Sequence, residues 1–286
     1  MRLGLIGTGR WGKHLARNFY ETGVLKVLCD LFPTFLYPDI PSCTDASTLF
    51  LDERISQIAI ATPPDTHYAL TKKALLAGKD VFVEKPLCFF VDEAKELIEL
   101  AHQNQLILMV GHLLHYHPCI VVLKKIIQSG QLGNIMSLQT IRSSPQRSNT
   151  TALWDLGPHD VSLILSLFGC SQSDLMCEGT EDDCKLTVTL PNSLQAQAFF
   201  SIGKERKEQK LSIVGSQATA IFTSNELLTL IPGGSFYSNK EPLREECDHF
   251  LDCCRSRTTP LTDGEEALRV INVLQKAEGK MRLIAK

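Results

Sequence analysis

The sequence lacks an excess of positive charge and any long, uninterrupted hydrophobic run. Its 29 lysines and arginines are outweighed by 32 aspartates and glutamates, which gives a net charge of −3. Neither a nucleic acid nor an anionic membrane surface is therefore a favoured partner. The most apolar stretch, Leu106 to Leu123, contains three histidines and is a poor candidate to cross a bilayer. The first apolar run ends at Gly7, so we expect no signal peptide.

Paired cysteine motifs are also missing, although the chain contains 10 cysteines. None of them forms a CxxC pair, and most lie within apolar patterns. We therefore expect buried free thiols in a reducing, cytoplasmic compartment. A hydrophobic content of 44% with 21% charged residues is typical of a globular protein, and 286 residues suit two domains.

Short apolar segments alternate with helical patterns through the first third of the chain. The pattern predicts strands near residues 3–6, 25–29, 55–61, 81–83 and 106–110, and helices near 11–21, 66–76 and 92–103. Because near-continuous apolar strands alternate with helices, we predict a doubly wound parallel sheet covered on both faces.

Strand patterns predominate beyond Pro118. They are expected near residues 135–141, 185–190, 194–202, 210–214, 218–223 and 227–231, with helices near 118–129, 156–167, 243–255 and 265–277. This succession predicts an open, mainly antiparallel sheet in an α+β domain. We therefore expect an α/β protein of two domains, 1–117 and 118–286.

A glycine-rich motif follows the first predicted strand and opens the first predicted helix. It fits GxGxxG and reads Gly7-Thr8-Gly9-Arg10-Trp11-Gly12. The first glycine permits a tight turn, the second lets a pyrophosphate approach the backbone, and the third lets helix and strand pack closely. The strand–turn–helix context makes a dinucleotide site the favoured interpretation over a glycine-rich turn without a ligand.

An acidic residue ends the second predicted strand, 18 positions after Gly12. This residue, Asp30, can accept hydrogen bonds from both hydroxyls of an adenosine ribose, and it would repel a 2′-phosphate. Leu31 and Phe32 follow it, so no arginine stands there to bind such a phosphate. NAD is therefore expected as the cofactor, and NADP is disfavoured.

Four further segments carry a family resemblance. They are Ala61-Thr62-Pro63-Pro64-Asp65-Thr66-His67, the run from Ala77 to Glu84-Lys85-Pro86, Trp154-Asp155-Leu156-Gly157-Pro158-His159-Asp160, and a tail with Cys247-Asp248-His249-Phe250 and Pro260-Leu261-Thr262-Asp263-Gly264. Together with GxGxxG, they resemble the glucose–fructose oxidoreductase, inositol dehydrogenase and rhizopine catabolism (Gfo/Idh/MocA) family nearly from end to end.

The resemblance implies an NAD-binding Rossmann domain at 1–117 and a substrate domain at 118–286. The open sheet of the second domain usually forms the oligomer interface, so a homo-oligomer, a dimer or a tetramer, is implied. The matching motifs place Thr62, Pro63, His67 and Glu84 in the cofactor site. Relatives usually fit a full helix and another strand between positions 30 and 55, where this chain has a short segment with three prolines.

Lys85 is the first candidate for catalysis. It follows a predicted strand, at the edge where ligands of open α/β sheets bind. The resemblance implies that Lys85 contacts both cofactor and substrate and stabilises the charge that develops on a substrate oxygen. It also implies that the Lys85–Pro86 peptide is often cis.

Asp155 and His159 are spaced four residues apart, so on a helix they share one face. Pro158 fits the first turn of such a helix. Imidazole suits proton transfer near neutral pH, and a nearby carboxylate can orient it or bind substrate hydroxyls. Taken alone, such a pair is more often a solvated helix surface. The resemblance favours catalysis instead, with His159 as the base and Asp155 as the residue that positions it.

Three histidines and a cysteine cluster at His112, His115, His117 and Cys119. Their spacing matches no common zinc arrangement, so no metal site is predicted. The resemblance implies that residues 111–118 join the two domains and border the substrate cleft. We therefore expect His112 and His115 to contact substrate, although Leu114 and His115 stand where relatives commonly have two arginines.

These features predict an NAD-dependent oxidoreductase. It would transfer a hydride between nicotinamide and a hydroxyl or keto carbon of a sugar or sugar nucleotide. Two alternatives stay open at this point: a sugar- or dinucleotide-sensing regulatory protein without turnover, and a dehydrogenase of non-sugar substrates such as dihydrodiols.

Overall fold

The chain forms two compact units in the computed structural model, which describes residues 1–33, 35–145, 150–169, 174–223 and 227–283. The first unit combines Met1–His112 with Leu243–Ile271, and the second combines Leu113–Pro242 with Asn272–Lys286. The predicted ranges 1–117 and 118–286 are contiguous and would place residues 243–271 in the second domain. Residues 243–271 instead pack with the first unit, because Phe250 in this segment joins the aromatic core that Phe19 and Phe82 form there.

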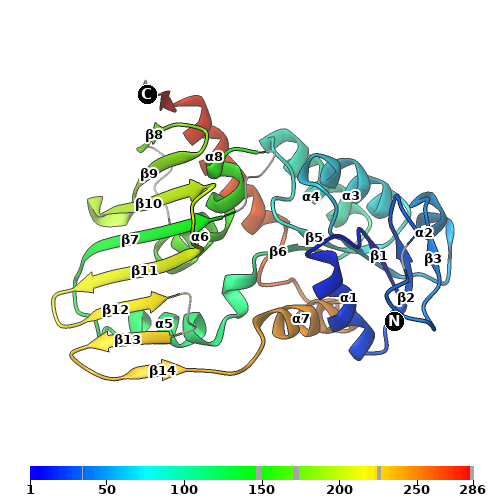
Figure 1. Cartoon of the computed structure of the whole chain (residues 1–286), viewed down its shortest axis with the longest axis horizontal. Coiled ribbons are helices and arrows are strands. Elements are labelled where there is room, and N and C mark those ends of the chain that lie inside the picture. Colours follow the sequence, from blue (N-terminus) through cyan, green and yellow to red (C-terminus); the bar gives the residue numbers. More distant parts are fainter. Residues whose placement is uncertain (34, 146–149, 170–173, 224–226, 284–286) are drawn as a thin grey trace. The chain divides into compact units, whose positions relative to one another are not determined.

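The first unit is built on a parallel sheet (Figure 1). Its strand order within the described residues is β3-β2-β1-β4-β5-β6, and every pair in it is parallel. The strands are β1 (Leu3–Ile6), β2 (Leu25–Cys29), β3 (Ser42–Cys43), β4 (Gln57–Ile60), β5 (Asp80–Glu84) and β6 (Leu108–Gly111). The strands β1, β4, β5 and β6 are buried throughout, as expected for strands covered on both faces.

Helices cover both faces of this sheet, with α3 and α4 on one face and α1 and α7 on the other (Figure 1). The helices of this unit are α1 (Gly12–Glu21), α2 (Ser47–Leu51), α3 (His67–Leu76), α4 (Val91–Gln103), α7 (Pro242–Ser256) and the first half of α8 (Gly264–Gly279), with a 3₁₀ turn η1 (Pro64–Thr66). Phe19 of α1, Phe82 of β5 and Phe250 of α7 meet in edge-to-face pairs with centroids 5.8 to 6.5 Å apart. This aromatic cluster fixes α7 to the sheet.

The second unit contains a larger, mainly antiparallel sheet (Figure 1). Its order within the described residues is β14-β13-β12-β11-β7-β10-β9-β8-β15, and only the β7–β10 and β8–β15 pairs are parallel. The strands are β7 (Ile135–Ser144), β8 (Leu175–Gly179), β9 (Asp183–Thr189), β10 (Gln195–Ile202), β11 (Glu208–Gly215), β12 (Thr219–Thr223), β13 (Leu227–Ile231), β14 (Ser235–Tyr237) and β15 (Arg282–Leu283).

One face of this sheet packs against helices, since buried and less buried residues alternate along β9, β10 and β12. The unit contains α5 (Pro118–Gln128), α6 (Ala152–Phe168), the second half of α8, and the 3₁₀ turns η2 (Leu113–Tyr116) and η3 (Pro191–Ser193). α6 packs on β7, β9 and β10, and α5 packs on β12, β13 and β14. The predicted α/β class, a parallel sheet followed by a mainly antiparallel one, is confirmed.

Candidate functional site

The glycine loop after β1 has the shape that a pyrophosphate requires. Gly7 has a φ of +93°, and a Cβ added there would lie 2.5 Å from the carbonyl oxygen of Ala61. A Cβ at Gly12 would lie 2.1 Å from the carbonyl oxygen of Gly7, so the third glycine permits the close packing of loop and helix. Nothing lies within 4 Å of a Cβ at Gly9, so this position faces open space. The loop thus leaves its middle glycine accessible at the N-terminus of α1.

Asp30 lies beside this loop at the end of β2. Its Oδ2 accepts hydrogen bonds from the backbone nitrogen of Thr8 at 2.7 Å and from Thr8 Oγ1 at 2.8 Å. Burial opposes ionisation of Asp30, but the hydrogen bonds from Thr8 and the following backbone outweigh it and lower the pKa of the carboxyl group. Asp30 is therefore a carboxylate at neutral pH, the form that would accept ribose hydroxyls.

The segment after Asp30 is reduced, as its length and prolines indicate. It forms only the two-residue strand β3 and the five-residue helix α2. Leu31 and Phe32 are 84% and 78% exposed, and neither could neutralise a 2′-phosphate. The residues that follow Asp30 therefore favour a ribose without a 2′-phosphate, as in NAD.

A second pair of loops follows β4 and β5. His67, at the start of α3, is buried, with Nδ1 2.7 Å from the carbonyl oxygen of Pro86 and Nε2 2.9 Å from that of Thr62. Burial lowers the pKa of this histidine. His67 therefore joins the two loops, and the Thr62 hydroxyl is 2.6 Å from that of Thr66. Pro63 lies between these residues, at the entry to the 3₁₀ turn.

Glu84, Lys85 and Pro86 stand at the carboxyl end of β5, and the Lys85–Pro86 peptide is cis. Glu84 is 8% exposed and accepts a hydrogen bond from the indole nitrogen of Trp11 in the glycine loop. Burial raises the pKa of Glu84 to about 7. The family resemblance implies a cofactor-binding role for Glu84, but its contact with Trp11 was not predicted.

The predicted cofactor residues thus lie together along one edge of the parallel sheet. The glycine loop with Arg10 follows β1, Asp30 follows β2, Thr62 and Pro63 follow β4, and Lys85 follows β5. This is the edge where open α/β sheets bind their ligands. The geometry fits a dinucleotide, because the open position at Gly9 lies between the acid of β2 and the loops of β4 and β5.

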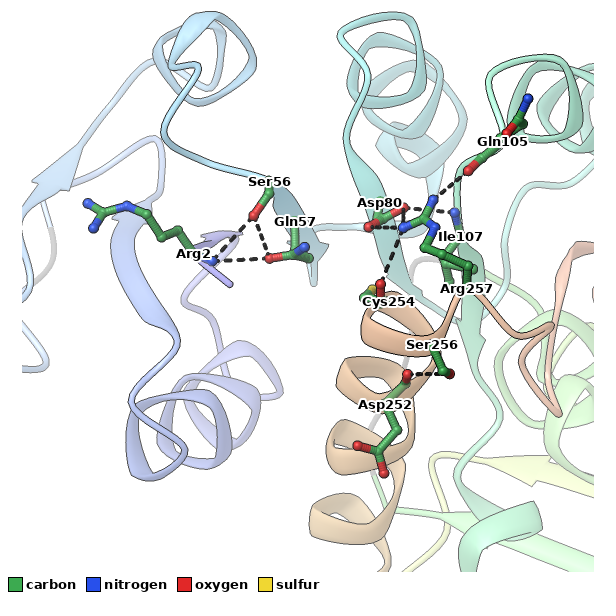
Figure 2. A network of polar contacts seen from close by, with 10 residues as sticks. All are labelled: Arg2, Ser56, Gln57, Asp80, Gln105, Ile107, Asp252, Cys254, Ser256 and Arg257. Atoms are coloured by element: carbon green, nitrogen blue, oxygen red, sulfur yellow. Dashed lines mark hydrogen bonds and ion pairs between the residues drawn. The ribbon is translucent and has the colours of Figure 1, made fainter.

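The opposite edge of the same sheet is closed by a different set of contacts (Figure 2). Arg257 donates to both carboxylate oxygens of Asp80 at 3.0 and 2.8 Å, and the backbone nitrogen of Ile107 donates to Asp80 Oδ1 at 2.9 Å. A cavity of about 390 Å³ lies next to this network, lined by residues that include His102, Arg257 and Asp263. These contacts stabilise the amino ends of β5 and β6, and none of the predicted site residues lines the cavity.

The histidines after β6 have separate partners. His112 in the first unit is buried, and its Nδ1 pairs with the carboxylate of Glu266. His115 in the second unit has Nε2 2.6 Å from Ser162 Oγ and Nδ1 3.3 Å from Lys124 Nζ. His117 Nδ1 accepts a hydrogen bond of 3.2 Å from the backbone nitrogen of Cys119 at the start of α5. Each histidine therefore has a local structural role, and substrate contact by His112 and His115 stays a prediction.

Asp155 and His159 both lie on α6 in the second unit. The expectation that Pro158 occupies the first turn is wrong, because α6 begins at Ala152 with Thr151 as its N-cap and Pro158 lies inside the helix. The four-residue spacing still places Asp155 and His159 on one helix face. Lys85 belongs to the first unit, so the grouping of these three residues in one catalytic site stays a prediction.

One buried ion pair next to His159 has no counterpart in the sequence-based prediction. Asp160 Oδ1 accepts from Arg142 Nε at 3.1 Å and from Nη2 at 2.6 Å, and both side chains are less than 10% exposed. The pair ties α6 to β7 and so fixes the helix that carries His159. The sequence signal that could have revealed this ion pair is Arg142, because it falls at a position of β7 that alternates with less buried residues and so faces inward.

Nine of the ten cysteines lie in the described residues, all nine are free, and eight of them are buried. Cys43 is half-buried, and Cys170 falls outside the described residues. Within the part of the chain that the structure describes, no helix has the length and apolarity needed to span a membrane.

Comparison with known proteins identifies the family. Residues 1–112 match the model described as "Oxidoreductase family, NAD-binding Rossmann fold", and residues 120–221 match the GFO/IDH/MocA C-terminal domain. The chain therefore belongs to the Gfo/Idh/MocA oxidoreductase family, and its first unit contains the NAD-binding Rossmann fold.

The relatives differ in how much of their length is matched. The UDP-N-acetylglucosamine 3-dehydrogenase of Acidithiobacillus ferrooxidans is 25% identical, over 95% of this chain and 94% of that protein. A crystal structure of the enzyme of that name and organism superimposes with a TM-score of 0.88 at 22% identity, covering 98% of this chain and 97% of the other. The oxidoreductase C115.03 of Schizosaccharomyces pombe is 32% identical, but over only 48% of this chain and 40% of that protein.

Proposed function

We propose that this protein is an NAD-dependent dehydrogenase that oxidises a hydroxyl carbon of a sugar or sugar nucleotide, or reduces the corresponding keto carbon. The observation that carries the proposal is the carboxyl edge of the first sheet, where the open Gly9 position, the Asp30 carboxylate and Lys85 follow three strands of one sheet. Full-length similarity to an enzyme named UDP-N-acetylglucosamine 3-dehydrogenase supports a sugar nucleotide as the substrate class.

The residues of the first unit would hold the cofactor. The amides of the glycine loop and the N-terminus of α1 would bind the pyrophosphate, and Asp30 would accept the adenosine ribose hydroxyls. Bound NAD would supply the hydride acceptor at its nicotinamide. Asp30 would repel the 2′-phosphate of NADP, which favours NAD.

The proton and the developing charge would be handled by the protein itself. His159 would take the proton of the substrate hydroxyl, and Asp155, on the same helix face, would orient the imidazole. Lys85 would stabilise the negative charge on the substrate oxygen, an electrostatic contribution typical of such sites. His112 and His115 would line the substrate side.

A substrate panel with matched variants tests the proposal. Purified protein is incubated with NAD and a series of UDP-sugars, free sugars, inositols and dihydrodiols, and NADH formation is followed by absorbance. We expect turnover of at least one sugar-type substrate, a loss of turnover of at least about 100-fold in Lys85→Ala and in His159→Asn, and NADH binding that stays nearly intact in both variants. Lys95→Ala, an exposed position on α4, is the matched control.

Two outcomes would contradict the proposal. Binding of NADH without turnover of any substrate would favour a sensing role, and turnover of a dihydrodiol alone would move the substrate out of the sugar class. Loss of NADH binding in Lys85→Ala would show that this lysine serves the cofactor rather than the reaction.

We also propose a homo-oligomer, a dimer or a tetramer, formed through the second sheet. Ile141, Phe199 and Ile221 lie on neighbouring or nearby strands at positions that alternate with the buried, helix-facing residues. Light scattering would test it: Phe199→Lys is expected to reduce the assembled mass, and a monomeric wild-type protein would contradict it. The nine free thiols support a cytoplasmic location, which fractionation of producing cells would check.

A further inference from the structure

Two buried carboxyl groups, Glu84 of β5 and Glu246 of α7, lie close enough to interact electrostatically, and the proposed reaction uses neither as an acid or a base. Phe82 of β5 packs against Phe250 of α7 with ring centroids 5.8 Å apart. Glu84 lies two residues after Phe82 and so shares its strand face, and Glu246 lies one helical turn before Phe250 and so shares its helix face. The two glutamates therefore occupy adjoining positions in this layer, with 8% and 0% of their surfaces exposed.

Glu246 has no means of stabilising a charge. Among the described residues, neither of its carboxyl oxygens has a hydrogen-bond partner. Burial raises the pKa of Glu246 well above its usual range, and the nearby charge of Glu84 raises it further. An ionised carboxylate in such a place would lose its hydration without any compensating donor, so Glu246 is a neutral acid.

Glu84 has the opposite surroundings. The indole nitrogen of Trp11 donates to its Oε1, and the charges of Lys85 and His112 favour its ionised form. A Cβ at Gly111 would lie 3.1 Å from Glu84 Oε1, so a glycine there leaves room for the carboxylate. Burial raises the pKa of Glu84 to about 7, which places its ionisation in the neutral range.

The remaining charged and titratable groups of the layer come from α7, α8 and β6. The Cys247 thiol is buried beside Glu246, and burial raises its pKa well above the usual range, so it stays neutral. Arg244 and Asp248, two residues before and after Glu246 on α7, form a half-buried ion pair with each other. His112, which ends the β6 segment, is paired with Glu266 of α8.

We propose that Glu84 and Glu246 form a buried carboxyl pair that keeps one proton on Glu246, while the charge on Glu84 holds Trp11 and thereby positions the glycine loop. Glu84 is in this view a positioning residue that acts on the cofactor through Trp11. Deprotonation of Glu84 strengthens the hydrogen bond from Trp11, because donors bind a carboxylate more strongly than a neutral acid. The arrangement of the cofactor loop is therefore linked to pH near neutrality, and its consequence for NADH binding rests on the proposed function.

Fluorescence of Trp11 in the cofactor-free protein tests the pair directly. The chain has two tryptophans, so Trp154→Phe leaves Trp11 as the only emitter. We expect its emission to follow a single titration between pH 5.5 and 8.5 with a midpoint near 7. Adding Glu84→Gln should abolish the titration, and adding Glu246→Gln should leave the midpoint within about half a pH unit, because an amide replaces an acid that is already neutral. Trp11→Phe, in which only Trp154 emits, is the matched control and should be flat.

A flat titration of Trp11, or one that survives Glu84→Gln, would overturn the proposal. A fall of more than one unit in the midpoint on Glu246→Gln would also overturn it, because Glu246 would then have carried charge. If Trp154→Phe does not fold, 5-fluorotryptophan in the wild-type chain gives separate fluorine resonances for the two indoles and allows the same titration. None of these readouts requires NADH, so failure of the proposed function leaves the test intact.

The consequence for the cofactor is measured separately. The NADH dissociation constant of the wild type should fall several-fold between pH 6 and pH 8, and that dependence should be flattened in Glu84→Gln. An unchanged pH dependence in this variant would show that the ionisation of Glu84 does not affect NADH binding through Trp11 and the glycine loop.

Discussion

Substituting alanine for each of two glycines in the same loop separates cofactor binding from folding. An added Cβ at Gly9 meets no atom within 4 Å, whereas one at Gly12 would lie 2.1 Å from the carbonyl oxygen of Gly7. Gly9→Ala should therefore change the free energy of unfolding by no more than about 1 kcal/mol. Gly12→Ala forces loop and helix apart and should cost about 1–3 kcal/mol or more, as other overpacked sites do.

Although Gly9→Ala should hardly change stability, it should weaken the binding of NADH. Its open side is where the pyrophosphate approaches the backbone, so a methyl group there meets the phosphate instead of protein. An overpacking cost of about 1–3 kcal/mol on the bound state corresponds to a loss of affinity of about 5- to 150-fold. Urea denaturation measures the stability of each variant, and titration with NADH measures its affinity. A stable Gly9→Ala protein that binds NADH like the wild type would refute the placement of the pyrophosphate at this loop.

Three further predictions concern buried groups in the two units. Burial raises the pKa of Glu84 from 4.5 to about 7, so its contribution to the free energy of unfolding should decline as pH rises from about 4.5 to above 7. Glu84→Gln should remove up to about 3 kcal/mol of that decline, as measured by urea titrations at pH 5 and pH 8. Arg142→Met leaves Asp160 buried and unpaired and should cost about 3–5 kcal/mol in chemical denaturation, whereas a loss below 1 kcal/mol would contradict the structural role of the pair. Phe250→Ala opens a cavity in the aromatic cluster of the first unit and should cost about 3–5 kcal/mol; an unchanged midpoint of unfolding would show that α7 does not belong to that core.

Local patterns in the sequence were sufficient to predict the long elements. The strand at 25–29 and the helix at 91–103 have clear apolar patterns, and GxGxxG marks the start of the first helix. The strands β3, β14 and β15 went unpredicted, because two or three residues carry too little periodicity, and the five-residue strand β8 was also missed. The membership of residues 243–271 in the first unit also lay beyond sequence patterns, since it depends on contacts among Phe19, Phe82 and Phe250 that are distant in the chain.

In the candidate site, too, the residues of local motifs were predicted and the contacts between distant residues were not. The spacing of Gly7, Gly12 and Asp30 predicted the dinucleotide edge, because that chemistry constrains residues close in sequence. Pro158 was misplaced because the N-cap, Thr151, lies before a helical turn that the sequence pattern did not reveal. The burial of Glu246 went unpredicted because a carboxylate usually marks the exposed face of a helix, although its spacing from Leu243 and Phe250 places it on the buried face of α7.

Binding of the reduced dinucleotides tests most directly whether an NAD-specific dehydrogenase site lies at the carboxyl edge of the first sheet. Tryptophan is excited in the Trp154→Phe protein, and energy transfer from Trp11 to the nicotinamide is followed during separate titrations with NADH and NADPH. We expect saturable transfer with NADH and at least about tenfold weaker binding of NADPH, since apposed like charges at Asp30 cost several kcal/mol. Absence of saturable transfer with both, or NADPH binding as tight as NADH, would contradict it.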